Sequence, residues 1–108
     1  MAKTYAEKFK DPRWQKKRLE ILERDGFSCV LCGTEKITLH VHHGYYERGF
    51  DPWEYESETL WTLCEECHEG VGNELRDCHL ELARLRPGPD IYGLVIHGLV
   101  ALRSEENT

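Results

Sequence analysis

The chain has 108 residues, a length typical of one domain with a modest core, and we expect a single domain over residues 1–108. Apolar residues make up 40% of the chain and charged residues 31%, a balance that excludes the disordered and membrane-embedded classes. No apolar run reaches the roughly 18–20 residues that span a bilayer, and the start lacks the apolar stretch of a secretory signal. We therefore expect a cytoplasmic protein without membrane contact.

Charge is divided unevenly along the chain. Residues 1–24 hold eight Lys/Arg and four Asp/Glu, a net +4, whereas residues 25–108 hold six Lys/Arg and sixteen Asp/Glu, a net −10. A polyanion would therefore meet the protein through its N-terminal segment. Within that segment, "KKR" at 16–18 is either a solvated helix face or a phosphate contact.

The first predicted element is a helix that begins at Pro12. Asp11 is a favoured N-cap residue, and proline is favoured in the first helical turn. Apolar residues then follow at helical spacing from Trp14 to Leu22, and Gly26 can end the helix.

Two short strands are predicted next, separated by a polar and aromatic loop. In "KITLHVHH" at 36–43, apolar and polar residues alternate, which is the pattern of a strand with one buried face. The apolar run "TLWTLC" at 59–64 predicts the second strand.

The last third of the chain predicts a helix and then a short apolar tail. Residues 65–86 read as helical, with a break or a new cap near Gly70–Gly72, and Pro87-Gly88-Pro89 ends the helix. The β-branched, glycine-containing run at 91–102 predicts one or two short strands or an irregular clasp, which could pair with a second copy. The expected fold is a small α+β domain with its core at about 13–75, followed by a C-terminal helix and β tail over 76–108.

Four of the five cysteines form two Cys-x-x-Cys pairs, Cys29/Cys32 and Cys64/Cys67. A Cys-x-x-Cys turn presents two sulfurs to one ion, and two such turns complete the tetrahedral shell that Zn²⁺ prefers. In a reducing compartment this spacing favours a structural zinc site that ties the two turns together. Redox-active dithiols and buried free thiols are the alternatives, although the βαβ pattern of thioredoxin-like proteins is absent.

The histidines concentrate near the cysteine pairs. A zinc ion that holds Cys67 also fixes His68, the next residue. The strand that ends at His42-His43 follows the first cysteine turn closely, since only ten residues lead from Cys32 to His42. We therefore expect His42 and His68 to lie close together, where imidazoles are good ligands for divalent metals. His40 shares a strand face with His42, and either approaches this ion or is an ordinary surface or half-buried histidine.

Three segments together resemble the His-Asn-His (HNH) nucleases, also called ββα-metal nucleases, over about residues 13–75: "CVLC" at 29–32, "LHVHH" at 39–43 and "LWTLCEECHEG" at 60–70. The resemblance implies a zinc-stapled β-hairpin and helix that grip one catalytic divalent ion, Mg²⁺ or an ion such as Mn²⁺ or Ni²⁺. It implies that His42 and His68 bind this ion, and that His43 is the general base that activates water for attack on a DNA phosphodiester. The four cysteines would hold the structural zinc.

Two positions depart from the family pattern. Thr59 stands where the family usually has the asparagine that steadies the loop bearing the general base, so the resemblance makes Thr59 a candidate catalytic-site residue. Many members have a further metal ligand four residues after the last histidine, which here is Gly72. The neighbouring Asn73 would serve as a ligand only if the helix were distorted.

Two functions therefore remain open. The first is a metal-dependent DNA endonuclease, in which the basic N-terminal helix docks on the phosphate backbone, and a partner protein could deliver DNA to the acidic body. The second is a non-catalytic, zinc-scaffolded module that binds nucleic acid or protein and derives from such a nuclease. The candidate DNA contacts are Lys16, Lys17, Arg18 and Arg24.

Overall fold

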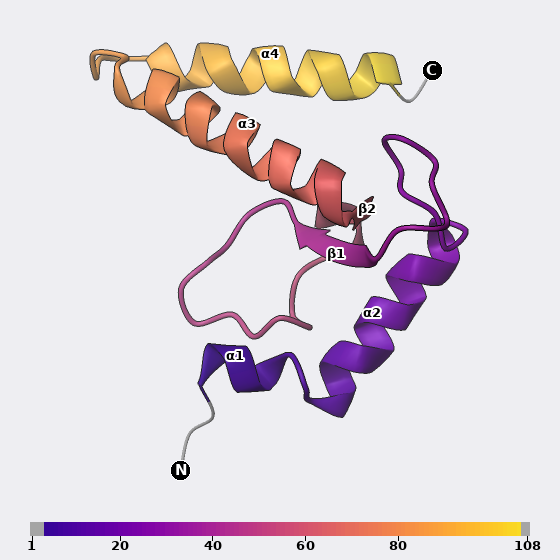
Figure 1. Ribbon diagram of the computed structural model, residues 1–108. Helices are drawn as coiled ribbons and strands as arrows, with labels where there is room; N and C mark the ends of the chain where they lie inside the picture. Colours follow the sequence, from indigo (N-terminus) through magenta and orange to yellow (C-terminus); the bar gives the residue numbers. More distant parts are fainter. Residues whose placement is uncertain (1–3, 107–108) are drawn as a thin grey trace. The chain divides into compact units, whose positions relative to one another are not determined.

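The computed structural model describes residues 4–106, and within the chain it distinguishes two compact units (Figure 1). The first unit, Met1–Asn73, contains two N-terminal helices, a two-stranded sheet and the start of a third helix. The second unit, Glu74–Thr108, contains the rest of that helix and a fourth one. The mixture of helices with an antiparallel sheet confirms the α+β expectation.

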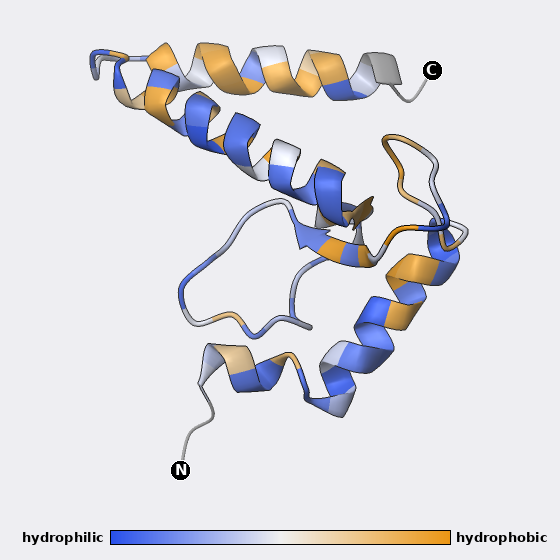
Figure 2. Ribbon diagram, in the orientation of Figure 1, coloured by the Kyte–Doolittle hydropathy of each residue, from blue (hydrophilic) through white to orange (hydrophobic). Residues whose placement is uncertain are grey.

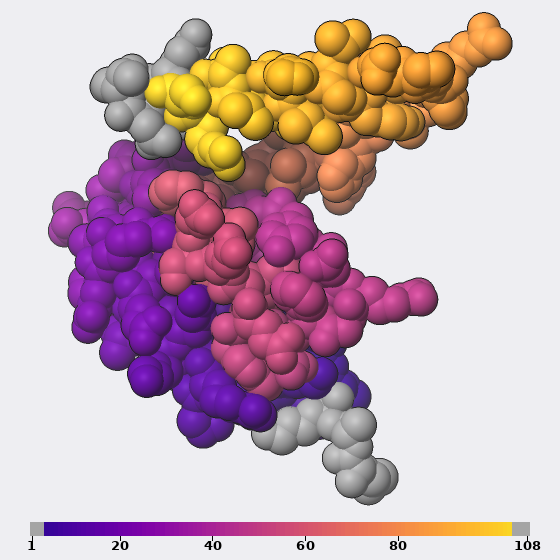
Figure 3. Space-filling model, turned by 180° about the vertical axis from the view of Figure 1, so that it is seen from behind, coloured from indigo at the N-terminus to yellow at the C-terminus, as the bar shows by residue number. Residues whose placement is uncertain are grey.

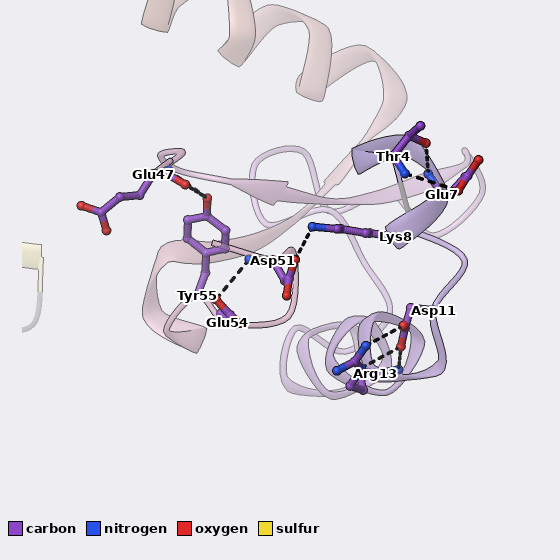
Figure 4. Close-up of polar contacts among 9 residues, drawn as sticks. All are labelled: Thr4, Glu7, Lys8, Asp11, Arg13, Glu47, Asp51, Glu54 and Tyr55. Carbon is purple, nitrogen blue, oxygen red and sulfur yellow. Dashed lines mark hydrogen bonds and ion pairs between the residues drawn. The ribbon is translucent and has the colours of Figure 1, made fainter. Parts of the chain in front are cut away.

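Helix α2 (Pro12–Arg24) begins where the sequence predicts. The Asp11 carboxylate accepts the backbone N–H of Arg13 at 2.8 Å and also pairs with the Arg13 guanidinium, which satisfies a donor that the helix itself leaves free (Figure 4). The helix turns one apolar face inward, and its buried residues are Trp14, Ile21 and Leu22.

Strands β1 (Leu39–His43) and β2 (Leu60–Cys64) pair antiparallel as a two-stranded sheet. The register sets Leu39 opposite Cys64 and His43 opposite Leu60. A short 3₁₀ turn, η1 (Ser57–Thr59), leads into β2. This register brings the end of the first strand beside the start of the second, so His43 lies near the residues that precede β2.

The main core forms where α2 packs on the sheet and on the loop between the strands. Its buried members are Trp14, Ile21, Leu22, Val41, Tyr55 and Leu60. The Tyr55 hydroxyl accepts the backbone N–H of Glu47 at 2.9 Å, which fastens the loop to itself (Figure 4). Figure 3 shows the residues before β2, in rose, against the violet α2, where Lys17 and Arg24 hydrogen-bond Ser57.

A short helix that the sequence did not predict, α1 (Tyr5–Lys8), precedes α2. Thr4 and Glu7 form a reciprocal capping box at its start. Lys8 forms an ion pair with Asp51 in the loop at 2.6 Å (Figure 4), so α1 closes over the loop that follows β1.

Helix α3 (Glu65–Ala83) is continuous, so the predicted break near Gly70–Gly72 is wrong. Glycine costs a helix only about 1 kcal/mol relative to alanine. Both glycines lie on exposed turns with no atom close to the position of a side chain. The hydrogen bonds of a 19-residue helix outweigh this cost, so the helix continues past both glycines.

Residues 91–106 form helix α4 (Ile91–Glu106), so the predicted β tail is also wrong. A strand here would need a partner for its backbone groups, and the two described strands pair only with each other. A helix satisfies those groups internally. No helix in the described part of the chain is long and apolar enough to cross a bilayer.

Candidate functional site

The four paired cysteines converge on one point. Their sulfur atoms all lie within 4.8 Å of one another, and the Cys32 and Cys64 sulfurs are 3.7 Å apart. Sulfurs at the corners of a tetrahedral zinc site, each about 2.3 Å from the ion, are separated by roughly 3.8 Å. A disulfide would bring two sulfurs to about 2.05 Å, and all five cysteines are free thiols. The cluster is therefore compatible with a structural zinc site.

The first cysteine turn is shaped by backbone hydrogen bonds. Gly33 N–H donates to the Cys29 carbonyl at 2.9 Å, and Cys29 N–H donates to the Thr34 carbonyl at 3.0 Å. Gly33 has φ +77°, a conformation that glycine adopts without steric cost. Val30 N–H bonds the Thr62 carbonyl at 3.0 Å, so this turn is attached directly to β2.

The second cysteine turn joins β2 to α3. Cys64 is the last residue of β2, and its sulfur accepts the backbone N–H of Cys67 at 3.4 Å. This sulfur thus occupies the place of an N-cap acceptor at the start of α3.

The thiols of the cluster differ in acidity. Burial raises the pKa of Cys29, but backbone N–H groups from both cysteine turns outweigh it and bring the pKa down to about 6. Hydrogen bonding to the Cys64 side chain raises the pKa of Cys67 to about 12. The Cys29 thiol is therefore the one that ionises near neutral pH. A cation that binds Cys67 would have to displace the proton of that thiol.

The predicted proximity of His42 and His68 is present in the structure. Their ring centroids are 5.3 Å apart in an edge-on arrangement, and His40 stacks on His68 at 5.4 Å. His40 and His42 come from one face of β1, and His68 comes from the first turn of α3. The ligand nitrogens of these three imidazoles are not all close enough to hold one ion as they stand. Among the described residues, only the four cysteines form a group of three or more ligand atoms that all lie within 4.8 Å of one another.

His43 points to the opposite side of β1 and is almost fully buried, with 3% of its surface exposed. It stacks on Trp14 at 5.1 Å and on Tyr46 at 5.2 Å. Its Nε2 lies 3.1 Å from the Pro52 carbonyl oxygen. Because a carbonyl only accepts hydrogen bonds, Nε2 must carry the proton, and Nδ1 keeps a lone pair.

A hollow of about 280 Å³ connects the two histidine environments. His40, His43 and His68 all line it, although His42 does not. Its remaining lining consists of Phe9, Trp14, Arg18, Val41 and Tyr46. The hollow therefore combines an aromatic wall, one arginine and three imidazoles.

The environment favours the neutral forms of His42, His43 and His68. Burial lowers the pKa of His42, and the neighbouring His68 and His43 lower it further. Burial also lowers the pKa of His68, and the neighbouring His40 lowers it further. Burial lowers the pKa of His43, although the hydrogen bond that His43 donates to the Pro52 carbonyl opposes this shift. Neutral imidazole is the form that binds a metal ion or accepts a proton.

Thr59 lies beside the end of β1 and contacts it through its backbone. Gly44 N–H donates to the Thr59 carbonyl at 2.8 Å, and a side chain at Gly44 would come within 3.1 Å of that oxygen. The Thr59 hydroxyl donates to the Glu56 carbonyl at 2.7 Å and closes the 3₁₀ turn. Thr59 thus steadies the residue after His43 without an asparagine side chain.

Asn73 is exposed and lies five residues beyond His68 on α3. At about 100° per residue, five residues turn a helix to a different face. The continuous helix lacks the distortion that Asn73 would need to join His68.

The four predicted DNA-contacting cations have different surroundings. Arg24 donates to the Leu60 carbonyl at 2.6 Å, pairs with Asp25 and lies over the Trp61 ring, so it is committed to the fold. Lys17 bonds Ser57, and Arg18 makes a long 3.4 Å contact with the Leu39 carbonyl while lining the hollow. Lys16 is exposed.

Sequence reasoning missed the neighbours of His43. Tyr46 and Pro52 reach it from the loop after β1, and Phe9 reaches it from the residue that follows α1. No local spacing connects Pro52 or Phe9 to the strand. The one signal was the density of aromatic residues in the loop at 45–55.

The comparisons with known proteins do not assign this chain to a family. No protein-family model matches the sequence, and no curated protein or solved structure matches it either. Any functional assignment therefore depends on the residues themselves.

Proposed function

We propose that this protein is a metal-dependent endonuclease of the HNH type, which hydrolyses DNA phosphodiester bonds in the hollow beside β1. The observation that carries the proposal is the placement of His43. It is locked by one nitrogen to the Pro52 carbonyl, it lines a hollow, and it shares that hollow with Arg18 and His68.

His43 is the general base of this proposal. Its lowered pKa keeps it neutral at cellular pH, and its Nδ1 lone pair is the position that accepts a proton from water. As the ring becomes positively charged, the Pro52 carbonyl stabilises the N–H on the far side. This division of roles between the two ring nitrogens is how an oriented imidazole acts as a base in other hydrolases.

His42 and His68 are the residues that would hold the catalytic divalent ion. Two adjacent neutral imidazoles suit a transition ion such as Mn²⁺ or Ni²⁺, and Mg²⁺ would rely more on water and phosphate oxygens. When bound, the ion supplies charge stabilisation for the phosphoryl oxygens. The Cys29, Cys32, Cys64 and Cys67 cluster would hold zinc and keep His68 in place through α3.

Arg18 is the cation best placed to bind the phosphate, because it lines the same hollow as His43. The exposed Lys16 and the half-buried Lys17 extend the positive charge along α2. The acidic character of the rest of the chain favours contact through this face alone, and a partner protein that brings DNA to it fits the same charge pattern.

The burial of His43 also supports a second candidate function. A histidine packed between Trp14 and Tyr46 could serve the core alone, in which case the protein is a non-catalytic, zinc-scaffolded binding module. A cleavage assay separates the two candidates.

The test is nicking of supercoiled plasmid with Mg²⁺, Mn²⁺ or Ni²⁺ by the full chain and by His43→Ala. We expect the variant to lose about 10²- to 10⁴-fold in rate, the range typical of a removed general base. His97→Ala, an exposed imidazole on α4, is the matched control and should cleave like the parent. Zinc content and circular dichroism check the fold of each protein. Equal cleavage by parent and His43→Ala, or none by either, would favour the binding module.

A further inference from the structure

Helix α4 has an unusual composition for a helix near a surface. From Ile91 to Leu102 it contains no charged residue. Figure 2 shows much of α4 in the orange of hydrophobic residues. At about 100° per residue, Leu94, Ile96 and Leu102 point in directions spread around the axis. Helices that are apolar on all sides are normally buried.

The described residues of the second unit do not bury this helix. Of the side chains at 74–104, none is buried, and Leu94 is 68% exposed. Between α3 and α4 lies an open groove of about 690 Å³, lined mainly by apolar side chains. Its lining residues are Leu75, Asp77, Cys78, His79, Glu81, Leu82, Leu85, Val95 and Leu99. The hairpin thus presents both an empty apolar groove and an apolar helix.

We propose that this surface is a dimer interface, in which the groove of the α3–α4 hairpin is filled by helix α4 of a second copy of the chain. Every copy carries both the groove and a helix suited to fill it, which is the self-complementarity that a two-fold interface requires. Two such hairpins together make a four-helix bundle with an apolar interior.

The exposed area agrees with a dimer. Six large apolar side chains of α4 are 45–68% exposed: Tyr92, Leu94, Ile96, Leu99, Val100 and Leu102. Tyr92 alone can bury roughly 150–250 Å² when fully covered, and the five aliphatic side chains enlarge the apolar area that one chain offers. Leu80 and Leu82 of α3 add to this area. A standard stable interface buries about 800 Å² on each partner.

Other kinds of occupant fit the charge pattern less well. Helices that lie on membranes carry lysine or arginine along a polar face, whereas α4 has no cation before Arg103. The same lack of cations disfavours a nucleic acid. An uncharged apolar partner helix remains, and this chain supplies one.

The test uses the full, zinc-loaded chain and two readouts. Sedimentation velocity over a range of concentrations should show a dimer, and Leu99→Glu should shift it to a monomer. Leu19→Glu is the same substitution at a leucine of α2 that is 48% exposed, against 60% for Leu99, and it should leave the dimer intact. The second readout is the alkylation rate of Cys78, an exposed thiol that lines the groove. We expect alkylation of the unsubstituted chain to be at least tenfold slower at concentrations where it is a dimer than after dilution to the monomer.

Each other outcome overturns the proposal. A monomer with reactive Cys78 means that the groove stays open. A monomer with protected Cys78 means that another part of the same chain covers it. A dimer with fully reactive Cys78 means that the copies meet elsewhere. Because the Cys78 readout uses the unsubstituted chain, it holds even if Leu99→Glu unfolds the hairpin.

Discussion

Each unit of this chain is too small to have a large hydrophobic core, and the two units compensate for this in different ways. The first, residues 4–73 of the described chain, combines a small core with four converging sulfurs, and it buries Leu60 completely. The second has two helices and, across 74–104, no buried side chain. A small unit needs a covalent or metal staple, or a partner, to compensate for its limited core. The first unit has a cysteine cluster compatible with a zinc staple, and our dimer proposal supplies the partner for the second.

The tryptophans make this comparison measurable. Trp14, Trp53 and Trp61 all belong to the first unit. Tryptophan fluorescence therefore follows the first unit alone, while helical circular dichroism follows both. Substitutions in either unit can be scored separately on one sample.

The largest expected effect is the loss of the cysteine cluster. Cys64→Ser removes a buried sulfur and the acceptor at the start of α3, so we expect loss of bound zinc and of the cooperative fluorescence transition. Elemental analysis and urea unfolding measure both. Cys78→Ser, outside the cluster, should change neither. A Cys64→Ser protein that keeps one zinc and an unchanged transition would disprove the staple.

A core truncation should have the next largest effect. Leu60 is fully buried, and Leu60→Ala should lower the free energy of unfolding of the first unit by about 2–5 kcal/mol. Leu94→Ala, the same change at an exposed site of α4, should leave the fluorescence transition within about 0.5 kcal/mol of the parent. Comparable shifts from the two substitutions would mean that the units unfold as one.

The smallest expected effect concerns pH. Burial raises the pKa of Asp25, but Arg24 and the backbone N–H of Thr62 outweigh it, so the pKa lies below the ordinary 3.8. A lowered folded-state pKa gives stability that is present above about pH 4 and is lost as the pH falls further. Asp25→Asn should cost about 1–3 kcal/mol at pH 7 and flatten the acid side of the fluorescence-detected stability profile. An unchanged acid slope would contradict this assignment.

The sequence predicted the elements whose signals are local. The Asp11-Pro12 start of α2, the alternation in β1 and the two cysteine turns each depend on neighbouring residues, and the structure places all of them as expected. The sequence did not predict what distant segments bring together. The Pro52 carbonyl that orients His43 and the arginine that shares its hollow come from a loop and a helix with no spacing relation to the strand.

The errors at the C-terminal end have a common cause. β-branched residues and glycines in 91–102 favour a strand in isolation, and paired glycines favour a break in α3. Both preferences are worth about 1 kcal/mol or less per residue, and a continuous helix outweighs them by satisfying every internal backbone group. The absence of charge from Ile91 to Leu102 was the more informative signal, because it indicates a surface that needs a cover.

The sulfur at the start of α3 has a consequence for the order of folding. Starting a helix is the unfavourable step, since several residues must be fixed before the first hydrogen bond forms, whereas lengthening it is easy. Here the first turn contains Cys67, and its backbone N–H donates to the Cys64 sulfur. The residues that would bind the ion therefore also fix the conformation of this turn. Metal binding would then nucleate this helix. The turns beyond Asn73 would form afterwards, by propagation from the first turn that the cysteines fix.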